Sequence, residues 1–269
     1  MTGWRDKVVV VTGGSSGIGL ATARAFALRG AQVVLAARGE GALKDAADAL
    51  IHDGLKAHAI RCDVTSDGDV ASLISTVQQQ FGRLDVLVNN AGRSMRKPIL
   101  DTTPEDFRDL MDLNFLAVVR CTRAAVPLLE KVSGSIVNVS SLAGKSVTYF
   151  LGAYPATKFA LNAYSQQLRL ELHDRGVHVL SVCPGPVATP ILDKALHQAG
   201  EGIPTEYRRP GAGLKTRTLR PEEVAEAIVD GCESKRGELI FPGWGRFLLM
   251  VMALSSRLAA FISRSLTGR

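Results

Sequence analysis

The most regular feature of the chain is a series of short, almost wholly apolar runs rich in β-branched residues. They occur at 8–11, 32–36, 58–62, 86–88, 135–139, 178–182 and 238–241. Between them lie stretches with apolar residues at helical spacing, at 21–29, 43–52, 69–81, 107–129, 154–175 and 222–233. Because strands without a polar side are typical of sheets covered on both faces, this alternation predicts an α/β fold with about seven parallel strands, doubly wound by helices.

Length and composition support one large domain. The 269 residues show no break in composition, and we expect a catalytic domain over 1–245 followed by a helical extension over 246–269. Within the domain, the stretch 189–220 contains Pro, Gly and six basic residues without a clear period, and we expect it to be a substrate lid. The formal charge of +6 is spread along the chain without a nucleic-acid motif, so no nucleic-acid partner is expected.

The four cysteines, at 62, 121, 183 and 232, have neither CxxC nor Cys/His spacing. We therefore expect no metal site, no disulfide framework and a reducing compartment. Residues 1–7 lead directly into the first apolar run without the features of a signal peptide, and no run reaches about 20 uncharged apolar residues. These observations favour a cytoplasmic protein.

A glycine-rich turn follows the first predicted strand and precedes an alanine-rich helix. Its residues are Thr12, Gly13, Gly14, Ser15, Ser16, Gly17, Ile18 and Gly19. Glycines there allow positive φ and let backbone N–H groups approach a pyrophosphate, to which the start of the helix adds unpaired donors and its positive dipole end. The position between strand and helix predicts a dinucleotide site of the Rossmann type, although the spacing is GxxxGxG and not GxGxxG.

The residues after the second and third predicted strands suggest which dinucleotide binds. About 20 residues past the glycines, where a carboxylate grips the ribose 2′-hydroxyl in NAD-binding folds, stands Arg38. A permanently charged guanidinium suits a 2′-phosphate, so NADP(H) is favoured over NAD(H). Asp63, which ends the third run before Val64, has two open roles: accepting from the adenine amino group or capping a helix.

Candidate chemistry gathers where later strands end. Tyr154 and Lys158 lie four apart, hence on one helix face, with Pro155 placing Tyr154 at the first turn. An ammonium ~5 Å from a phenol is expected to lower its pKa by ~2 units and make it an acid–base. Ser141 follows the fifth strand, with Ser140 as the competing hydroxyl.

Two amide-bearing segments complete this set. Asn89, Asn90, Ala91 and Gly92 end the fourth strand. Asn114 lies within an otherwise apolar helix, where a buried amide needs partners.

Taken together, residues 7 to about 243 resemble the short-chain dehydrogenase/reductase family, in its branch of roughly 250 residues. The matching motifs occur in family order: Thr12-Gly13-x-x-x-Gly17-x-Gly19, Asp63-Val64, Asn89-Asn90-Ala91-Gly92, Asn114, Ser141, Tyr154-x-x-x-Lys158 and Pro184-Gly185. The resemblance implies a catalytic tetrad of Asn114, Ser141, Tyr154 and Lys158. Tyr154 moves the substrate proton, Ser141 orients the carbonyl oxygen, Lys158 holds the ribose and Asn114 supports a relay water. It also implies Asn90 beside the ribose, and Val187 and Thr189 at the carboxamide.

The function implied is an NADP(H)-dependent oxidoreductase that interconverts a ketone and a secondary alcohol, without a metal. Tyr149, Phe150, Leu151, Ile191 and Leu192 favour a lipophilic substrate, although ordinary packing explains them equally well. One alternative is a 3-oxoacyl thioester reductase, whose carrier phosphates would be bound by five basic residues: Arg208, Arg209, Lys215, Arg217 and Arg220. A solvated, disordered lid explains these five residues equally well. Another is a catalytically silent NADP-binding regulator.

The extension after Gly245 is not typical of the family branch. At ~100° per residue, Arg246, Arg257 and Arg264 lie within about 20° of each other, while apolar residues point elsewhere, which predicts an amphipathic helix over 246–264. Peripheral membrane contact and packing against the domain or a second subunit both remain open. The resemblance also implies a homodimer or homotetramer.

Overall fold

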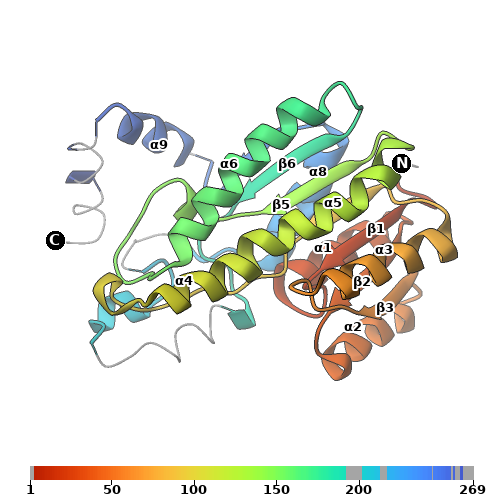
Figure 1. The fold of residues 1–269 in the computed structure, drawn as a ribbon, viewed down its shortest axis with the longest axis horizontal. Helices are drawn as coiled ribbons and strands as arrows, with labels where there is room; N and C mark the ends of the chain where they lie inside the picture. The colour runs from red at the N-terminus through yellow and green to blue at the C-terminus, as the bar shows by residue number, and fades with distance from the viewer. Residues whose placement is uncertain are drawn as a thin grey trace.

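The computed structural model describes residues 3–191, 202–212, 217–243, 245–255, 257 and 261–262. A single parallel sheet runs through the described molecule with strand order β3-β2-β1-β4-β5-β6-β7 (Figure 1). The strands are β1 (Val8–Thr12), β2 (Gln32–Ala37), β3 (Ala57–Arg61), β4 (Val86–Asn89), β5 (Ser135–Val139), β6 (His178–Cys183) and β7 (Glu238–Ile240). All seven predicted strands are confirmed, and so is the doubly wound Rossmann-type fold.

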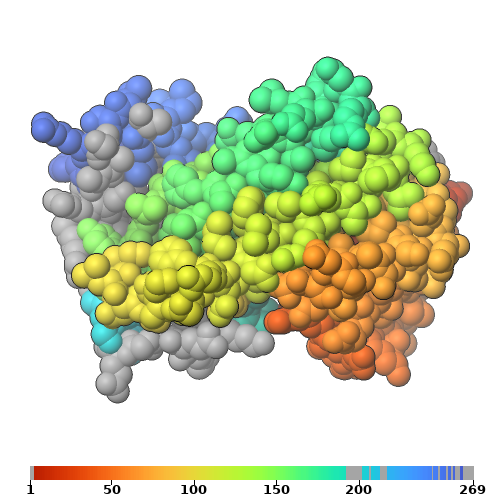
Figure 2. All heavy atoms as spheres, viewed as in Figure 1, coloured from red at the N-terminus to blue at the C-terminus, as the bar shows by residue number. Residues whose placement is uncertain are grey.

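Helices cover both faces of the sheet. They are α1 (Gly17–Leu28), α2 (Glu40–His52), α3 (Asp67–Phe81), α4 (Pro104–Met111), α5 (Ala117–Glu130), α6 (Tyr154–Leu172), α8 (Pro221–Glu233) and α9 (Gly245–Ala253). One apolar core lies under α1, α2 and α8, and the other under α3, α5 and α6. Figure 2 shows α5 and α6 crossing one face together, and the side chains of Thr122 and Tyr164 join them.

The two cores explain why the strands lack polar positions. In β1, Val9 and Val11 enter the core under α1, whereas Val8 and Val10 enter the core on the opposite face. Side chains alternate across a strand, so a sheet packed on both faces needs apolar residues at every position. The chain reverses direction along the sheet between β1 and β4, and ligands of such folds bind outside the carboxyl ends of the strands at that point.

The predicted helix over 107–129 differs from the observed structure. It begins at Pro104, after a Thr103 cap whose hydroxyl accepts from the Asp106 N–H at 3.2 Å, and a π-helical turn, η2 (Asp112–Leu116), joins α4 to α5. The wider turn contains Asn114, which is fully buried. The helix propensities of these residues do not predict a π-helical turn. Such turns are frequent at functional sites.

Helix α9 lies beside the cavity that is described in the next subsection. Leu249 and Met252 line the main cavity, whereas Phe247 and Met250 are exposed. The predicted helix over 246–264 is too long, because α9 ends at Ala253 and residues 254–255 are not helical; Arg264 lies outside the described residues. Within the residues that the structure describes, none of the helices is long and apolar enough to cross a membrane.

Candidate active site

The glycine-rich turn between β1 and α1 is held in a conformation that side chains would disturb. Gly13 and Gly17 have φ of +64° and +55°. A Cβ on Gly19 would lie 2.3 Å from the Gly13 carbonyl oxygen. Ser16 caps α1 without a side-chain hydrogen bond, so its side chain leaves the first N–H groups of the helix to a ligand.

Hydrogen bonds between Thr12, the last residue of β1, and Asn90, directly after β4, hold this turn in place. The Thr12 hydroxyl accepts from the N–H groups of Asn90 and Ala91 at 3.0 and 3.1 Å. The Asn90 side chain donates to the carbonyl oxygens of Thr12 and Gly13 at 3.0 and 3.2 Å. These bonds cross from β1 to β4 and fix the shape of the turn, a structural role that motif spacing alone does not indicate.

Substituting Gly19 tests this arrangement. We expect Gly19→Ala to lower the free energy of unfolding by ~1–3 kcal/mol, the usual cost of overpacking, and to weaken dinucleotide binding at least ~10-fold. Urea denaturation and coenzyme titration measure the two effects. The matched control is Gly41→Ala, because Gly41 lies inside α2, where Ala is favoured over Gly, and a Cβ there meets no atom within 4 Å. Equal behaviour of the two variants would contradict the role assigned to the turn.

Arg38 and Asp63 lie next to each other at the ends of β2 and β3. The Arg38 side chain is 64% exposed, and its Nη1 is 3.9 Å from Asp63 Oδ2. Asp63 Oδ1 accepts from the backbone N–H and hydroxyl of Thr65 at 3.0 and 2.7 Å. Burial opposes ionisation of Asp63, but these bonds and the nearby arginines hold its pKa below the usual value. Asp63 therefore closes a turn before α3 and does not cap that helix, whose cap is Ser66, and Val64 beside it is buried.

The geometry separates the two candidate serines. Ser140 is buried, and its hydroxyl donates to the Lys158 carbonyl oxygen at 3.4 Å. Ser141 begins the short helix η3 (Leu142–Gly144), accepts from the Ala143 N–H at 3.1 Å and interacts with the Tyr154 phenol. Ser141 is therefore the hydroxyl available beside the phenol.

Tyr154 and Lys158 come from the first two turns of α6. Tyr154 is the first residue of the helix and Pro155 follows it in the first turn, as expected. Lys158 is 6% exposed; its Nζ donates to the Val139 carbonyl oxygen at 3.0 Å and lies 5.8 Å from the centre of the Tyr154 ring. The pair thus shares one face of the helix at the end of β5.

The prediction that Lys158 lowers the phenol pKa is wrong for this structure. Burial raises the pKa of Tyr154, and the Ser141 hydroxyl and the Arg96 guanidinium only partly offset it. Burial also lowers the pKa of Lys158, to about 8. Removal from water disfavours the charged form of both groups, and spacing along a helix does not show how deeply they are buried.

Asn114 joins three segments of the site. Its Oδ1 accepts from the Arg93 N–H at 2.9 Å, and its Nδ2 donates to the Arg93 carbonyl oxygen at 2.9 Å and to Thr157 Oγ1 at 3.1 Å. Thr157 in turn donates to the Tyr154 carbonyl oxygen at 2.7 Å. The buried amide is therefore fully partnered and holds the loop after β4 against the start of α6.

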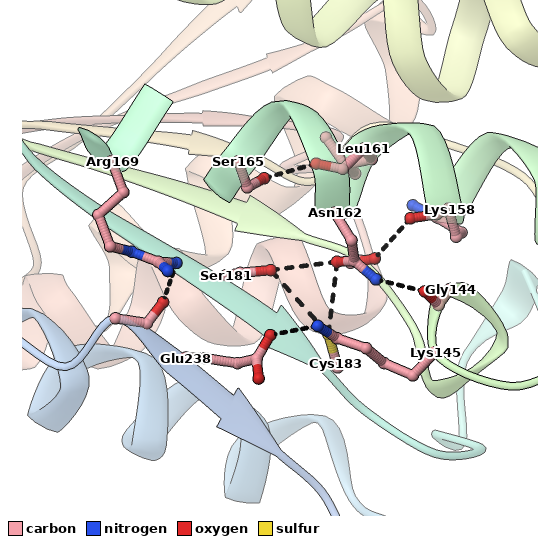
Figure 3. A network of polar contacts seen from close by, with 12 residues as sticks. Gly144, Lys145, Lys158, Leu161, Asn162, Ser165, Arg169, Ser181, Cys183 and Glu238 are labelled. Carbon is pink, nitrogen blue, oxygen red and sulfur yellow. Dashed lines mark hydrogen bonds and ion pairs between the residues drawn. The ribbon is translucent and has the colours of Figure 1, made fainter. Parts of the chain in front are cut away.

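A buried polar network anchors the rest of α6 (Figure 3). The Asn162 amide donates to the Gly144 carbonyl oxygen at 2.8 Å, and its oxygen accepts from the Ser181 hydroxyl at 3.2 Å. Beside it, Lys145 and Glu238 form an ion pair at 2.6 Å. Because these contacts join α6 to η3, β6 and β7, they fix the direction in which Lys158 and Tyr154 point.

One cavity of about 250 Å³ unites the two halves of the site. The predicted residues that line it are Ser16, Ile18, Asn90, Gly92, Ser140, Ser141, Tyr154, Lys158, Pro184, Gly185, Val187 and Thr189. Gly13, Ser15, Gly17, Gly19, Arg38, Asp63, Val64, Ala91 and Asn114 do not line it, although the turn residues and Asn114 contact residues that do.

The substrate end of the cavity agrees only in part with expectation. Leu151 and Ile191 line it, whereas Tyr149 and Phe150 pack against Tyr207 with ring centres 5.4 and 4.9 Å apart. Leu192 lies outside the described residues.

Several lining residues had no sequence signal. They are Arg93, Ser94 and Arg96 from the loop after β4 and Leu249 and Met252 from α9, whereas Gly211 and Ala212 come from the predicted lid. Nothing in the local pattern marks a loop arginine or a distant helix as part of a site.

Comparisons with known proteins identify the family. The family model described as short chain dehydrogenase matches residues 7–200. An uncharacterized oxidoreductase, YxnA, of Bacillus subtilis is 38% identical over 94% of this chain and 70% of its own length. Human dehydrogenase/reductase SDR family member 11 is 33% identical over 85% of this chain and 89% of its own.

Solved structures agree. A short chain dehydrogenase/reductase from Burkholderia phymatum, determined in complex with NAD, superposes with a TM-score of 0.83 at 25% identity, covering 96% of each chain. The chain therefore belongs to the short-chain dehydrogenase/reductase family of oxidoreductase enzymes.

Proposed function

We propose that the protein is an NADP(H)-dependent oxidoreductase that interconverts a ketone and a secondary alcohol on a lipophilic substrate. The observation that carries this proposal is that one cavity is lined both by Ser16 and Ile18 of the glycine-rich turn and by Ser141, Tyr154 and Lys158. Most of its other lining residues are apolar, which suits a lipophilic substrate.

The residues fit a nicotinamide dinucleotide. The positive-φ glycines and the uncapped start of α1 suit a pyrophosphate, and Arg38 suits a 2′-phosphate. Lys158, beside the cavity, would bind the ribose, and Val187 and Thr189 would contact the carboxamide. When bound, the coenzyme supplies or accepts the hydride. The complex of the Burkholderia relative with NAD supports this class of coenzyme.

Tyr154 would then carry the proton step. Its raised pKa keeps the hydroxyl protonated at neutral pH, as a proton donor to a carbonyl oxygen requires. Ser141 would hold the same oxygen by a hydrogen bond, and the Asn114 bonds would keep Tyr154 in place. A general acid in this position contributes typically 10²–10⁴-fold to the rate.

The alternatives meet specific obstacles. For the thioester reductase, Arg217 and Arg220 form ion pairs with Glu223 and Lys215 lies outside the described residues, so the basic set has competing partners. For the silent regulator, the close grouping of Ser141, Tyr154 and Lys158 argues for turnover. A panel of ketones, alcohols and 3-oxoacyl thioesters, followed by nicotinamide absorbance with both coenzymes, distinguishes all three. Turnover of thioesters alone, or of nothing, would overturn the proposal.

Exposed apolar side chains on α6 support an oligomer. Phe159 and Leu170 of α6 are 44% and 79% exposed. We propose that copies of the chain associate through α6. We further propose that α9 forms a wall of the substrate site, because Leu249 and Met252 line the cavity.

Charge reversal at Arg38 tests the coenzyme preference. Arg38→Asp should raise the KM for NADPH about 10-fold or more while changing kcat little, because a charge-assisted hydrogen bond is worth ~1.5–3 kcal/mol. Steady-state kinetics with NADPH and NADH measure it. Arg5→Asp is the control, because Arg5 is exposed and precedes β1, at the amino ends of the strands and away from the carboxyl ends where Arg38 lies. An unchanged preference between the coenzymes would refute the role of Arg38.

A further inference from the structure

The cavity carries positive charge without a compensating carboxylate. Arg93, Arg96 and Lys158 line it, and none of its described lining residues is Asp or Glu. Lys158 has a role in the proposed function and Arg93 is exposed. Arg96 is therefore the cation that the proposed function leaves unexplained.

Arg96 is buried without an adequate partner. It is 8% exposed, and its Nε has no hydrogen-bond partner among the residues that the structure describes. Its Nη1 reaches only the carbonyl oxygen of the adjacent Met95, at 3.5 Å. In the described part of the chain no carboxylate pairs with it, and burial lowers its pKa.

Other cations of the molecule do have carboxylate partners. Lys97, the next residue, pairs with Asp106 at 2.6 Å, and Asp106 is further occupied by the Thr103 N–H at 2.9 Å. Arg83 forms two bonds to Asp85, at 2.8 and 2.7 Å. A buried charge without a partner costs several kcal/mol, so an unpaired guanidinium at a cavity wall is expected to have a partner outside the chain.

Its place in the cavity defines the partner's chemistry. Arg96 is close enough to the Tyr154 phenol for the two to interact electrostatically, whereas Leu151, Leu249 and Met252 give the cavity apolar walls. A ligand that fills this space needs an anionic group near the reacting carbon and an apolar remainder. The planar guanidinium fork pairs bidentately with carboxylates and phosphates, and of these two groups the singly charged carboxylate is the better suited to a cavity with apolar walls.

We propose that Arg96 binds a carboxylate of the substrate, so that the enzyme acts on oxo acids, or the corresponding hydroxy acids, with an apolar chain. This inference rests on the proposed function and narrows its substrate class from lipophilic ketones to those that also carry an acid. Arg96 is then a specificity-determining residue.

Matched substrates test it. The kcat/KM of straight-chain 4-, 5- and 6-oxo acids is compared with that of their methyl esters, using the wild type, Arg96→Gln and Arg96→Lys. We expect the wild type to prefer at least one acid over its ester by roughly 10- to 100-fold, the scale of one charge-assisted hydrogen bond. Arg96→Gln should bring that ratio close to one, and Arg96→Lys should keep part of it.

The control is Arg108→Gln, because Arg108 is 72% exposed on α4 and pairs with Glu105; it should keep the wild-type ratio. Equal acid and ester activity in the wild type, or an unchanged ratio in Arg96→Gln, would overturn the inference while leaving the proposed function intact. Reduction of neither acids, esters nor neutral ketones would instead contradict the proposed function.

Binding gives an independent measurement that does not need turnover. Octanoate, which cannot be reduced at a ketone, should raise the Tm of the wild type and not that of Arg96→Gln. Because the variant removes an unpaired buried charge, its own Tm should not fall below that of the wild type. Equal stabilisation of both proteins by octanoate would contradict carboxylate binding at Arg96.

Discussion

Replacing Tyr154 by Phe is expected to lower kcat for ketone reduction by at least ~100-fold, the lower end of what a general acid contributes. The variant loses only the hydroxyl, while the bonds of Asn114 and Thr157 that hold the start of α6 use backbone atoms and other side chains. NADPH affinity should therefore remain within a few-fold of the wild type. Steady-state kinetics and coenzyme titration measure the two quantities.

Tyr164→Phe is the matched control, since Tyr164 lies on the same helix and packs against Phe115 at 5.8 Å between ring centres, away from the cavity lining. It should retain wild-type kcat. Undiminished turnover in Tyr154→Phe would remove this residue from the proton step.

Replacing Lys158 by Met is expected to lower kcat/KM by roughly 10- to 100-fold, because the charge-assisted hydrogen bond from the cation that would bind the ribose is lost. It should also change how stability depends on pH. The pKa of Lys158 is about 8 in the folded protein and ~10.4 in an unfolded chain. Between these values the unfolded chain binds more protons, so the wild type gains stability as pH rises, by roughly 3 kcal/mol in total.

The difference in unfolding free energy between wild type and Lys158→Met isolates this effect. Burial raises the pKa of the four cysteine thiols, which titrate in a similar range, but both proteins contain them. Urea unfolding near pH ~8 and ~10 should show the wild type gaining relative to the variant. A constant difference would mean that Lys158 is not held at a depressed pKa.

The fold followed from the sequence because its signals are local. Runs such as 8–11 are apolar at every position because alternate side chains enter two different cores. The glycine-rich turn contains positive φ angles that only glycine adopts without strain. The expected strands are all present, and Tyr154, Lys158 and Ser141 line one cavity.

What the sequence did not reveal depends on tertiary packing. The π-helical turn at Asn114, the buried Arg96 and the contribution of Leu249 and Met252 to the cavity arise from contacts between distant segments. The pKa of Tyr154 was predicted with the wrong sign for the same reason: spacing brought Lys158 to the right face, but burial decides the balance of charge.

A crystal structure with bound NADP⁺ would show whether the coenzyme and the Tyr154 phenol share one cavity. We expect the pyrophosphate at the start of α1, the 2′-phosphate beside Arg38 and the nicotinamide in the cavity next to Tyr154 and Ser141. A nicotinamide bound outside this cavity, or a Tyr154 hydroxyl turned away from it, would rule out the shared site.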